Sequence, residues 1–96
     1  MATMTKQQFL VESGIEVVTL DVWLDREWLL PDRSAPEPAF TALDLARARL
    51  IADLIRVFGV NDEGVSVILH LTDQLYGLRQ MMLQLRDARE RPLNVD

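Results

Sequence analysis

The chain of 96 residues contains no cysteine and only one histidine, His70. The absence of cysteine excludes disulfide bonds and thiol chemistry, and a single histidine leaves no cluster of ligands for a zinc site. The sequence also has no glycine-rich phosphate loop, nucleophile elbow or metal-ligand spacing. We therefore expect no catalytic residues, no cofactor and no metal, and we expect that the protein is not an enzyme.

Long apolar runs are missing as well. No stretch approaches the roughly 20 apolar residues that a membrane span needs, and no short basic and then apolar leader opens the chain. These absences predict a cytoplasmic protein without a membrane partner. With 49% hydrophobic and 26% charged residues the chain should fold as one domain, although a domain of this length is marginal without a partner chain.

Basic residues are scarce in the first half of the chain. Residues 1 to 46 hold eight acidic and three basic residues, whereas residues 47 to 96 hold seven of each, so the first half carries the whole net charge of −5. An acidic surface is repelled by a phosphate backbone, which proteins bind with Lys and Arg. The charge distribution therefore argues against DNA as a partner.

The hydrophobic pattern predicts a mainly α-helical fold that begins with two short helices. Residues 5 to 8, with the sequence T-K-Q-Q, have the form of a capping box, and the helix that they start should stop near Ser13-Gly14. The stretch from Ile15 to Pro31 reads as an amphipathic helix over about residues 17 to 27. Three of its apolar residues share one face of that helix: Leu20, Trp23 and Leu24.

A proline-rich loop and two longer helices should follow. Three prolines between residues 30 and 40 predict a loop, or at most a short edge hairpin. Thr41 then caps a third helix, which should be the central core element and should stop at Gly59. A fourth helix should begin near Asp62 and end at Pro92. The core face predicted for the third helix consists of Leu43, Ala46, Leu50, Leu54 and Val57.

The last helix carries a coiled-coil pattern. The earlier helices should pack together in a domain head of residues 1–60, so none of them is left to cover this pattern. An exposed apolar stripe usually marks an interface. We predict a single compact domain in which residues 61–92 form an antiparallel or crossed homodimer. The dimer seam repeats at spacings of four and three, as a and d positions do: Leu71, Leu75, Leu78, Met82 and Leu85.

The order of these elements resembles a known family. The succession of helix, turn, helix ending in W-L-L-P, loop, long helix, F-G-V and final helix resembles the MerR-type winged helix-turn-helix. Within that group the chain is similar to the CbpM-like chaperone-modulator family. The resemblance spans nearly the whole chain and rests on order and spacing. It is carried by Phe9, Gly14-Ile15, Leu20, Trp23, Leu29 to Pro31, Phe40, Leu43 to Leu45, Phe58 to Val60, Asp62-Glu63 and the C-terminal stretch LTDQLYGLRQMMLQLR.

Departures from the DNA-binding pattern of MerR-like regulators favour the resemblance to the chaperone modulators. MerR-like regulators have an Arg-Tyr pair in the middle of the second helix, where this chain has Asp21 and Val22. Their basic, glycine-rich wing is replaced here by S-A-P-E-P-A-F. Contacts to guanine and to phosphate need cations at such positions. The resemblance instead implies binding to the J-domain of a DnaJ-like, CbpA-type cochaperone, in competition with Hsp70.

We predict that this partner meets the outer face of the second helix. A solvated surface is the alternative for any one of its acids alone, and Trp28 is either a clasp against the third helix or an exposed anchor. A second hypothesis is a MerR-type dimeric DNA-binding transcriptional regulator, whose DNA affinity would fall steeply with salt. The predicted partner-binding residues are Glu16, Val18, Asp21, Val22, Asp25 and Trp28.

Overall fold

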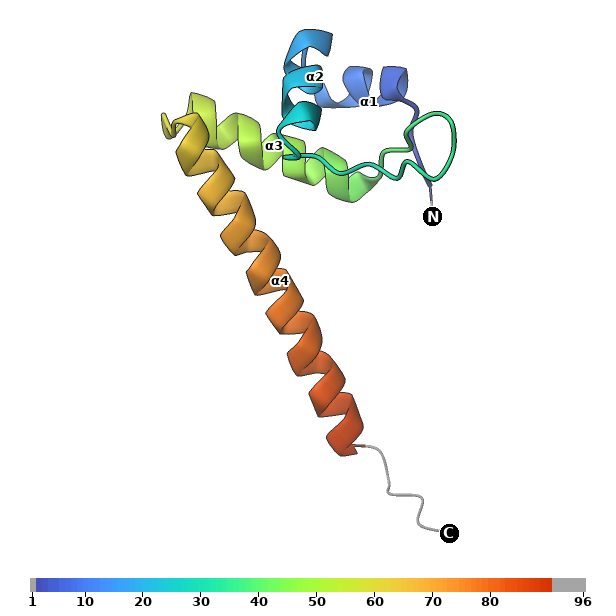
Figure 1. Cartoon of the computed structure of the whole chain (residues 1–96), viewed down its shortest axis with the longest axis vertical. Helices are drawn as coiled ribbons and strands as arrows, with labels where there is room; N and C mark the ends of the chain where they lie inside the picture. Colours follow the sequence, from blue (N-terminus) through green and yellow to red (C-terminus); the bar gives the residue numbers. More distant parts are fainter. Residues whose placement is uncertain (1, 91–96) are drawn as a thin grey trace. The chain divides into compact units, whose positions relative to one another are not determined.

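The computed structural model of the chain describes residues 2 to 90 (Figure 1). Within this range the helices are α1 (Lys6–Ser13), α2 (Val17–Asp25), α3 (Ala42–Arg56) and α4 (Asp62–Glu90), and β-structure is limited to two isolated bridges. The mainly α-helical fold expected from the sequence is thus confirmed. The predicted helix end at Pro92 lies outside the described residues.

The chain divides into two units between Val65 and Ser66. The N-terminal unit holds α1, α2, α3 and the first turn of α4, and the C-terminal unit continues along α4. The sequence predicts a boundary at residue 60 within one compact domain. The observed division comes later because Val65 is fully buried, which makes the start of α4 part of the core of the N-terminal unit.

The first helix begins and ends where the sequence predicts. The Thr5 hydroxyl accepts a hydrogen bond from the Gln8 backbone N–H at 3.2 Å, and the Gln8 side chain accepts one from the Thr5 N–H at 2.9 Å. Together they complete the capping box. Gly14 then ends the helix with φ of 73° and donates its N–H to the Leu10 carbonyl. Glycine suits this position because it has no Cβ to oppose a positive φ.

The N-terminal unit is closed by contacts between its first residues and the segment before α3. Phe9 and Phe40 are both fully buried and stack with ring centroids 4.4 Å apart. The backbones of Met4 and Phe40 exchange two hydrogen bonds of 2.7 and 2.9 Å. The core of this unit also contains Ile15, Leu20, Trp23, Trp28, Leu29, Ala48, Ile51 and Val65. α1 packs on α3, and Figure 1 shows α1 and α2 on the same side of that helix.

The proline-rich segment forms a loop closed by one bridge. Asp32 and Ala39 exchange two backbone hydrogen bonds of 3.0 and 2.9 Å, which agrees with the predicted loop or short hairpin. Inside the loop, the backbone N–H of Ser34 donates a hydrogen bond to the Asp32 carboxylate. This hydrogen bond, and to a smaller extent one from the Ser34 side chain, holds the pKa of Asp32 below its ordinary value. The loop therefore has local order without a continuous strand.

The core face of α3 differs from the predicted one. Its buried residues are Asp44, Ala48 and Ile51, which also follow helical spacing. The predicted face is wrong, because Leu43 and Val57 are each 70% exposed. Apolar residues lie on more than one side of this helix, so periodicity alone does not select the packed side. The buried face of α3 carries the small Ala48, whose short side chain permits close packing against another helix.

The start of α3 supplies a first stability test. Asp44 is buried, and its carboxylate accepts hydrogen bonds from the Thr41 N–H at 2.9 Å and from the Thr41 hydroxyl at 3.3 Å. We expect Asp44→Ala to lower the free energy of unfolding by about 1–3 kcal/mol, because the Thr41 N–H loses its acceptor. Urea denaturation followed by circular dichroism measures this loss. Removal of the exposed Glu12 carboxylate by Glu12→Ala should change stability by less than about 0.5 kcal/mol.

Candidate protein-binding surface

The second helix presents one exposed face and one buried face. Leu20 and Trp23 point into the core of the N-terminal unit. On the opposite side, side chains at spacings of three, four and seven residues form a single exposed face. This exposed face brings together four of the predicted partner-binding residues: Val18, Asp21, Val22 and Asp25.

Glu16 lies at the N-terminal end of this helix. It is the N-cap residue of α2, with extended backbone angles, and its side chain makes no capping hydrogen bond. Its exposed carboxylate is therefore placed beside the positive end of the helix dipole. The remaining acids of the predicted site lie further along the helix.

Trp28 belongs to the core instead of the exposed surface. It is only 3% exposed, so its prediction as a partner contact is wrong. The chain reverses after α2 because Glu27 adopts a φ of 60°, and the Trp28 N–H then donates to the Trp23 carbonyl at 2.9 Å. Arg47 of α3 donates its Nε–H to the Trp28 carbonyl. The alternative that Trp28 clasps the third helix is therefore the one that the structure supports.

Arg26 holds this reversed segment from outside. Its guanidinium lies 5.2 Å from the centre of the Trp28 ring, within the range of a cation–π interaction. The same guanidinium forms an ion pair of 2.6 Å with Asp62 at the start of α4. Trp23 and Trp28 pack at a centroid distance of 6.3 Å beneath it. These contacts fix the backbone that follows α2.

The end of α2 and the reversed segment enclose a depression of about 560 Å³. Glu27 and Leu30 are not among the six predicted partner-binding residues, and no local signal in the sequence predicts the positive φ that places Glu27 here. Three acids and one base stand around apolar side chains, of which Leu30 is well exposed. The depression is lined by Asp21, Leu24, Asp25, Glu27, Leu29, Leu30, Pro31 and Arg33.

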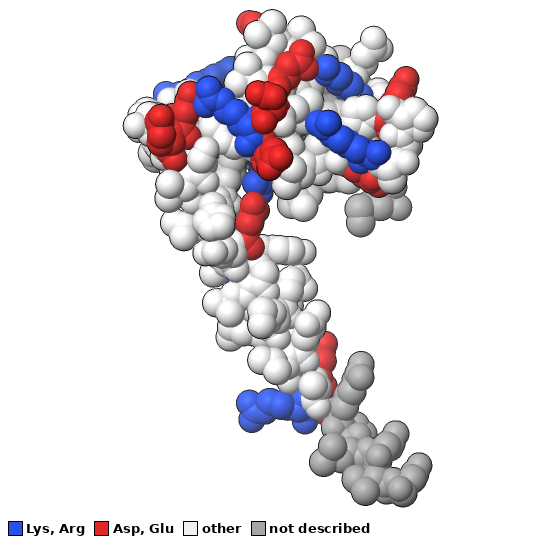
Figure 2. Space-filling model, viewed as in Figure 1, with Lys and Arg blue, Asp and Glu red and all other residues white. Residues whose placement is uncertain are grey.

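The acids of the depression differ in their charge partners. Asp21 forms an exposed ion pair of 2.8 Å with Lys6, which offsets part of its charge. Asp25 and Glu27 take part in no ion pair within residues 2 to 90. Figure 2 shows acidic side chains gathered beside basic ones on the visible face of the N-terminal unit. The negative potential of the depression therefore comes chiefly from Asp25 and Glu27.

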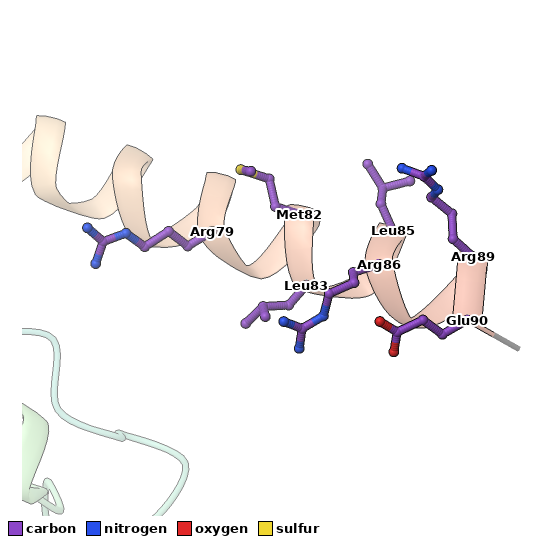
Figure 3. A pocket seen from close by; sticks show the side chains of 7 residues that line it. All are labelled: Arg79, Met82, Leu83, Leu85, Arg86, Arg89 and Glu90. Carbon is purple, nitrogen blue, oxygen red and sulfur yellow. The ribbon is translucent and has the colours of Figure 1, made fainter.

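The predicted dimer seam is exposed along the C-terminal unit. Leu71, Leu75, Leu78, Met82 and Leu85 all have about half or more of their surface accessible. Near the described end of α4 is a hollow of about 830 Å³ (Figure 3). Met82 and Leu85 lie on one side of the helix there, and Arg79, Leu83 and Arg86 lie on the other. Arg89 lies on the side of Met82 and Leu85, so arginines flank the apolar residues on both sides of the helix.

Comparison of the chain with models of protein families, with curated proteins and with solved structures finds no match. No helix within residues 2 to 90 is long and apolar enough to cross a membrane. In the same part of the chain, no three His, Asp or Glu side chains are grouped so as to hold a metal ion. The chain is thus a mainly α-helical protein with an acidic depression and an apolar stripe.

Proposed function

We propose that this protein is a cytoplasmic regulator that binds the J-domain of a DnaJ-like, CbpA-type cochaperone and inhibits it by competing with Hsp70. The proposal starts from the resemblance to the CbpM-like chaperone modulators. One observation supports it most directly, namely that Asp25 and Glu27 have no ion-pair partner among residues 2 to 90 and lie beside the exposed Leu30. J-domains are generally basic along the helix that meets Hsp70, so an acidic and apolar surface is complementary to them.

Charge and apolar contact have separate parts in the proposed complex. Asp25 and Glu27 steer the basic helix during the encounter and select the orientation in which it binds. Leu30 and Val22 supply apolar area whose burial gives most of the affinity. The mechanism is occupancy of the face that Hsp70 needs, so it requires no chemical step and no cofactor.

The rest of the chain fits the same proposal. α1, the turn at residues 14–16 and α2 serve as a MerR-like helix-turn-helix, and the loop closed by Asp32 and Ala39 serves as its short wing. α4 is the dimerisation helix. A homodimer presents two copies of the acidic depression, and so it binds up to two J-domains.

Reversal of the two acids tests the proposed surface. We expect wild-type protein to bind the isolated J-domain saturably, and we expect Asp25→Lys with Glu27→Lys to weaken binding at least about tenfold, because attraction becomes repulsion. Isothermal titration calorimetry measures both affinities. The matched control is Glu12→Lys, which changes the charge of an exposed acid outside the depression and should leave the affinity within about twofold.

Two outcomes would contradict the proposal. If the wild type shows no saturable binding to the J-domain, the function is wrong. If the double variant binds as the wild type does, the depression is not the binding surface. DNA binding at low salt that falls steeply as salt rises would favour the transcriptional regulator instead.

A further inference from the structure

The end of α4 has a second exposed face beside the proposed dimer seam. Leu83 directly follows the seam residue Met82, and neighbouring residues of a helix point about 100° apart, so Leu83 lies outside the seam. Its side chain is 42% exposed. A dimer through the seam therefore does not cover it. We call the four residues that Figure 3 shows on the side away from Met82 the arginine face of α4: Arg79, Leu83, Arg86 and Glu90.

The arginine face carries two cations without ion-pair partners. Arg79 and Arg86 are exposed and take part in no ion pair within residues 2 to 90. They lie two helical turns apart, about 10 Å along the axis, with Leu83 between them. Glu90 follows Arg86 by four residues. The face thus offers one apolar side chain between two positive charges, with a single negative charge at its end.

The depression of the N-terminal unit has the complementary pattern. Asp25 and Glu27 have no ion-pair partner among residues 2 to 90, and Leu30 beside them is 64% exposed. Arg33 lines the same depression and adds one charge of the opposite sign, as Glu90 does on the arginine face. Opposite charges attract and orient an encounter, and apolar side chains between them lose water on contact. The two surfaces therefore fit each other in charge and in apolar character.

The course of α4 shows which chain supplies the contact. Asp62 at its start forms the ion pair of 2.6 Å with Arg26, the residue between Asp25 and Glu27. From Asp62 the helix continues without interruption to Glu90, and it rises about 30 Å before it reaches Leu83. A continuous helix cannot fold back onto the residues beside its own start. A second copy is therefore the source of an arginine face for this depression.

We propose that the arginine face of α4 binds the depression of a second copy of this chain. Leu83 packs against Leu30 of the other copy, and its two flanking arginines meet Asp25 and Glu27 there. A single helix face is smaller than a standard interface of about 1,600 Å², so the contact is weak and exchanges quickly. One consequence rests on the proposed function, namely that a J-domain must displace the end of α4 in order to bind. The contact itself does not depend on that function.

The absence of cysteine allows a test in which each full-length chain carries one thiol. Leu83→Cys is activated as a mixed disulfide with nitrothiobenzoate and is mixed at micromolar concentration with Leu30→Cys. The thiolate of the Leu30→Cys chain attacks the cysteine sulfur of the activated chain, a disulfide joins the two chains, and nitrothiobenzoate leaves as a coloured thiolate. Its absorbance gives the rate. Only contact between copies is measured, because no chain holds two cysteines.

We expect Leu30→Cys to react with the activated chain at least about tenfold faster than Val11→Cys, because the contact raises the effective concentration of the two sulfur atoms. Val11 is the matched control, since it is 81% exposed and lies outside the depression, so accessibility alone would favour it. Each rate is divided by the rate of the same variant with dithiodipyridine, which corrects for differences in thiol reactivity. Activated Gln84→Cys, exposed but outside the arginine face, should show no preference between the two thiols.

Reversal of charge separates this contact from random collision. Arg79→Glu with Arg86→Glu in the activated chain should remove the excess rate, and Asp25→Lys with Glu27→Lys in the thiol chain should then restore it, because the charges are exchanged. Equal corrected rates for the depression and control thiols, or an excess that survives reversal of the two arginines alone, would overturn the proposal. No J-domain is present in these reactions, so their failure is distinct from a failure of the proposed function.

Discussion

Replacing Phe9 by alanine is expected to lower the free energy of unfolding by about 3–5 kcal/mol. The ring of Phe9 is fully buried and stacks on Phe40 with an interplanar angle of 18°. Phe40 in turn exchanges backbone hydrogen bonds with Met4. The cavity that Phe9→Ala leaves therefore lies where the first residues of the chain meet the segment before α3. Because native proteins are stable by only about 5–15 kcal/mol, this loss removes a large share of the stability.

Urea denaturation measures this loss, with the fluorescence of the buried Trp23 and Trp28 as the signal for the N-terminal unit. Val11→Ala is the control on the same helix, since Val11 is 81% exposed and its change should stay within about 0.5 kcal/mol. Phe9→Leu, which leaves a smaller cavity, should fall between the two. A loss below about 1 kcal/mol for Phe9→Ala would mean that the aromatic stack is not a main part of this core.

Local signals in the sequence predicted the helices well. The capping boxes at Thr5 and Thr41 and the glycine at position 14 act through neighbouring residues, so they can be read without knowledge of the fold. The buried face of α2 could be predicted in the same way, because Leu20 and Trp23 lie on one side of this helix and its acids lie on the other. A short helix with one apolar stripe can bury only that stripe.

Features that depend on packing were not predictable in the same way. α3 has two apolar stripes, and the choice between them depends on which one receives α1. The sequence leaves Trp28 open between a clasp on the third helix and an exposed partner contact, because it gives no sign that Glu27 takes a φ of 60° and reverses the chain. The same reversal creates the acidic depression. The acids of α2 could therefore be predicted, but the concave shape beside them could not.

The error at α3 also changes the interpretation of the molecule. The stripe that the sequence assigned to the core has sound helical periodicity, and the structure leaves most of it exposed. Periodic apolar residues indicate that a helix packs against something, without saying whether the neighbour belongs to the same chain. Both α3 and α4 therefore carry exposed apolar residues at helical spacing.

Leu78→Glu is expected to give the largest change in the assembly of the protein. Every described residue of α4 after Leu69 is exposed, so this part of the helix has no core of its own. Most helical stability in proteins comes from the packing of an apolar face, and the proposed seam gives this part of the helix a partner to pack on. A carboxylate at the middle of the seam would have to be buried, and we expect the dissociation constant of the dimer to rise at least about 100-fold.

The measurement combines light scattering with circular dichroism at 222 nm. The Leu78→Glu variant should show a lower mass than the wild type at micromolar concentration, together with a loss of helical signal from the C-terminal unit. Gln80→Glu adds the same charge on the opposite side of α4 and should change neither quantity, because that side remains in water. A wild type that is monomeric at this concentration would refute the seam. A wild-type assembly that keeps its mass in Leu78→Glu would instead place self-association on a surface other than the seam.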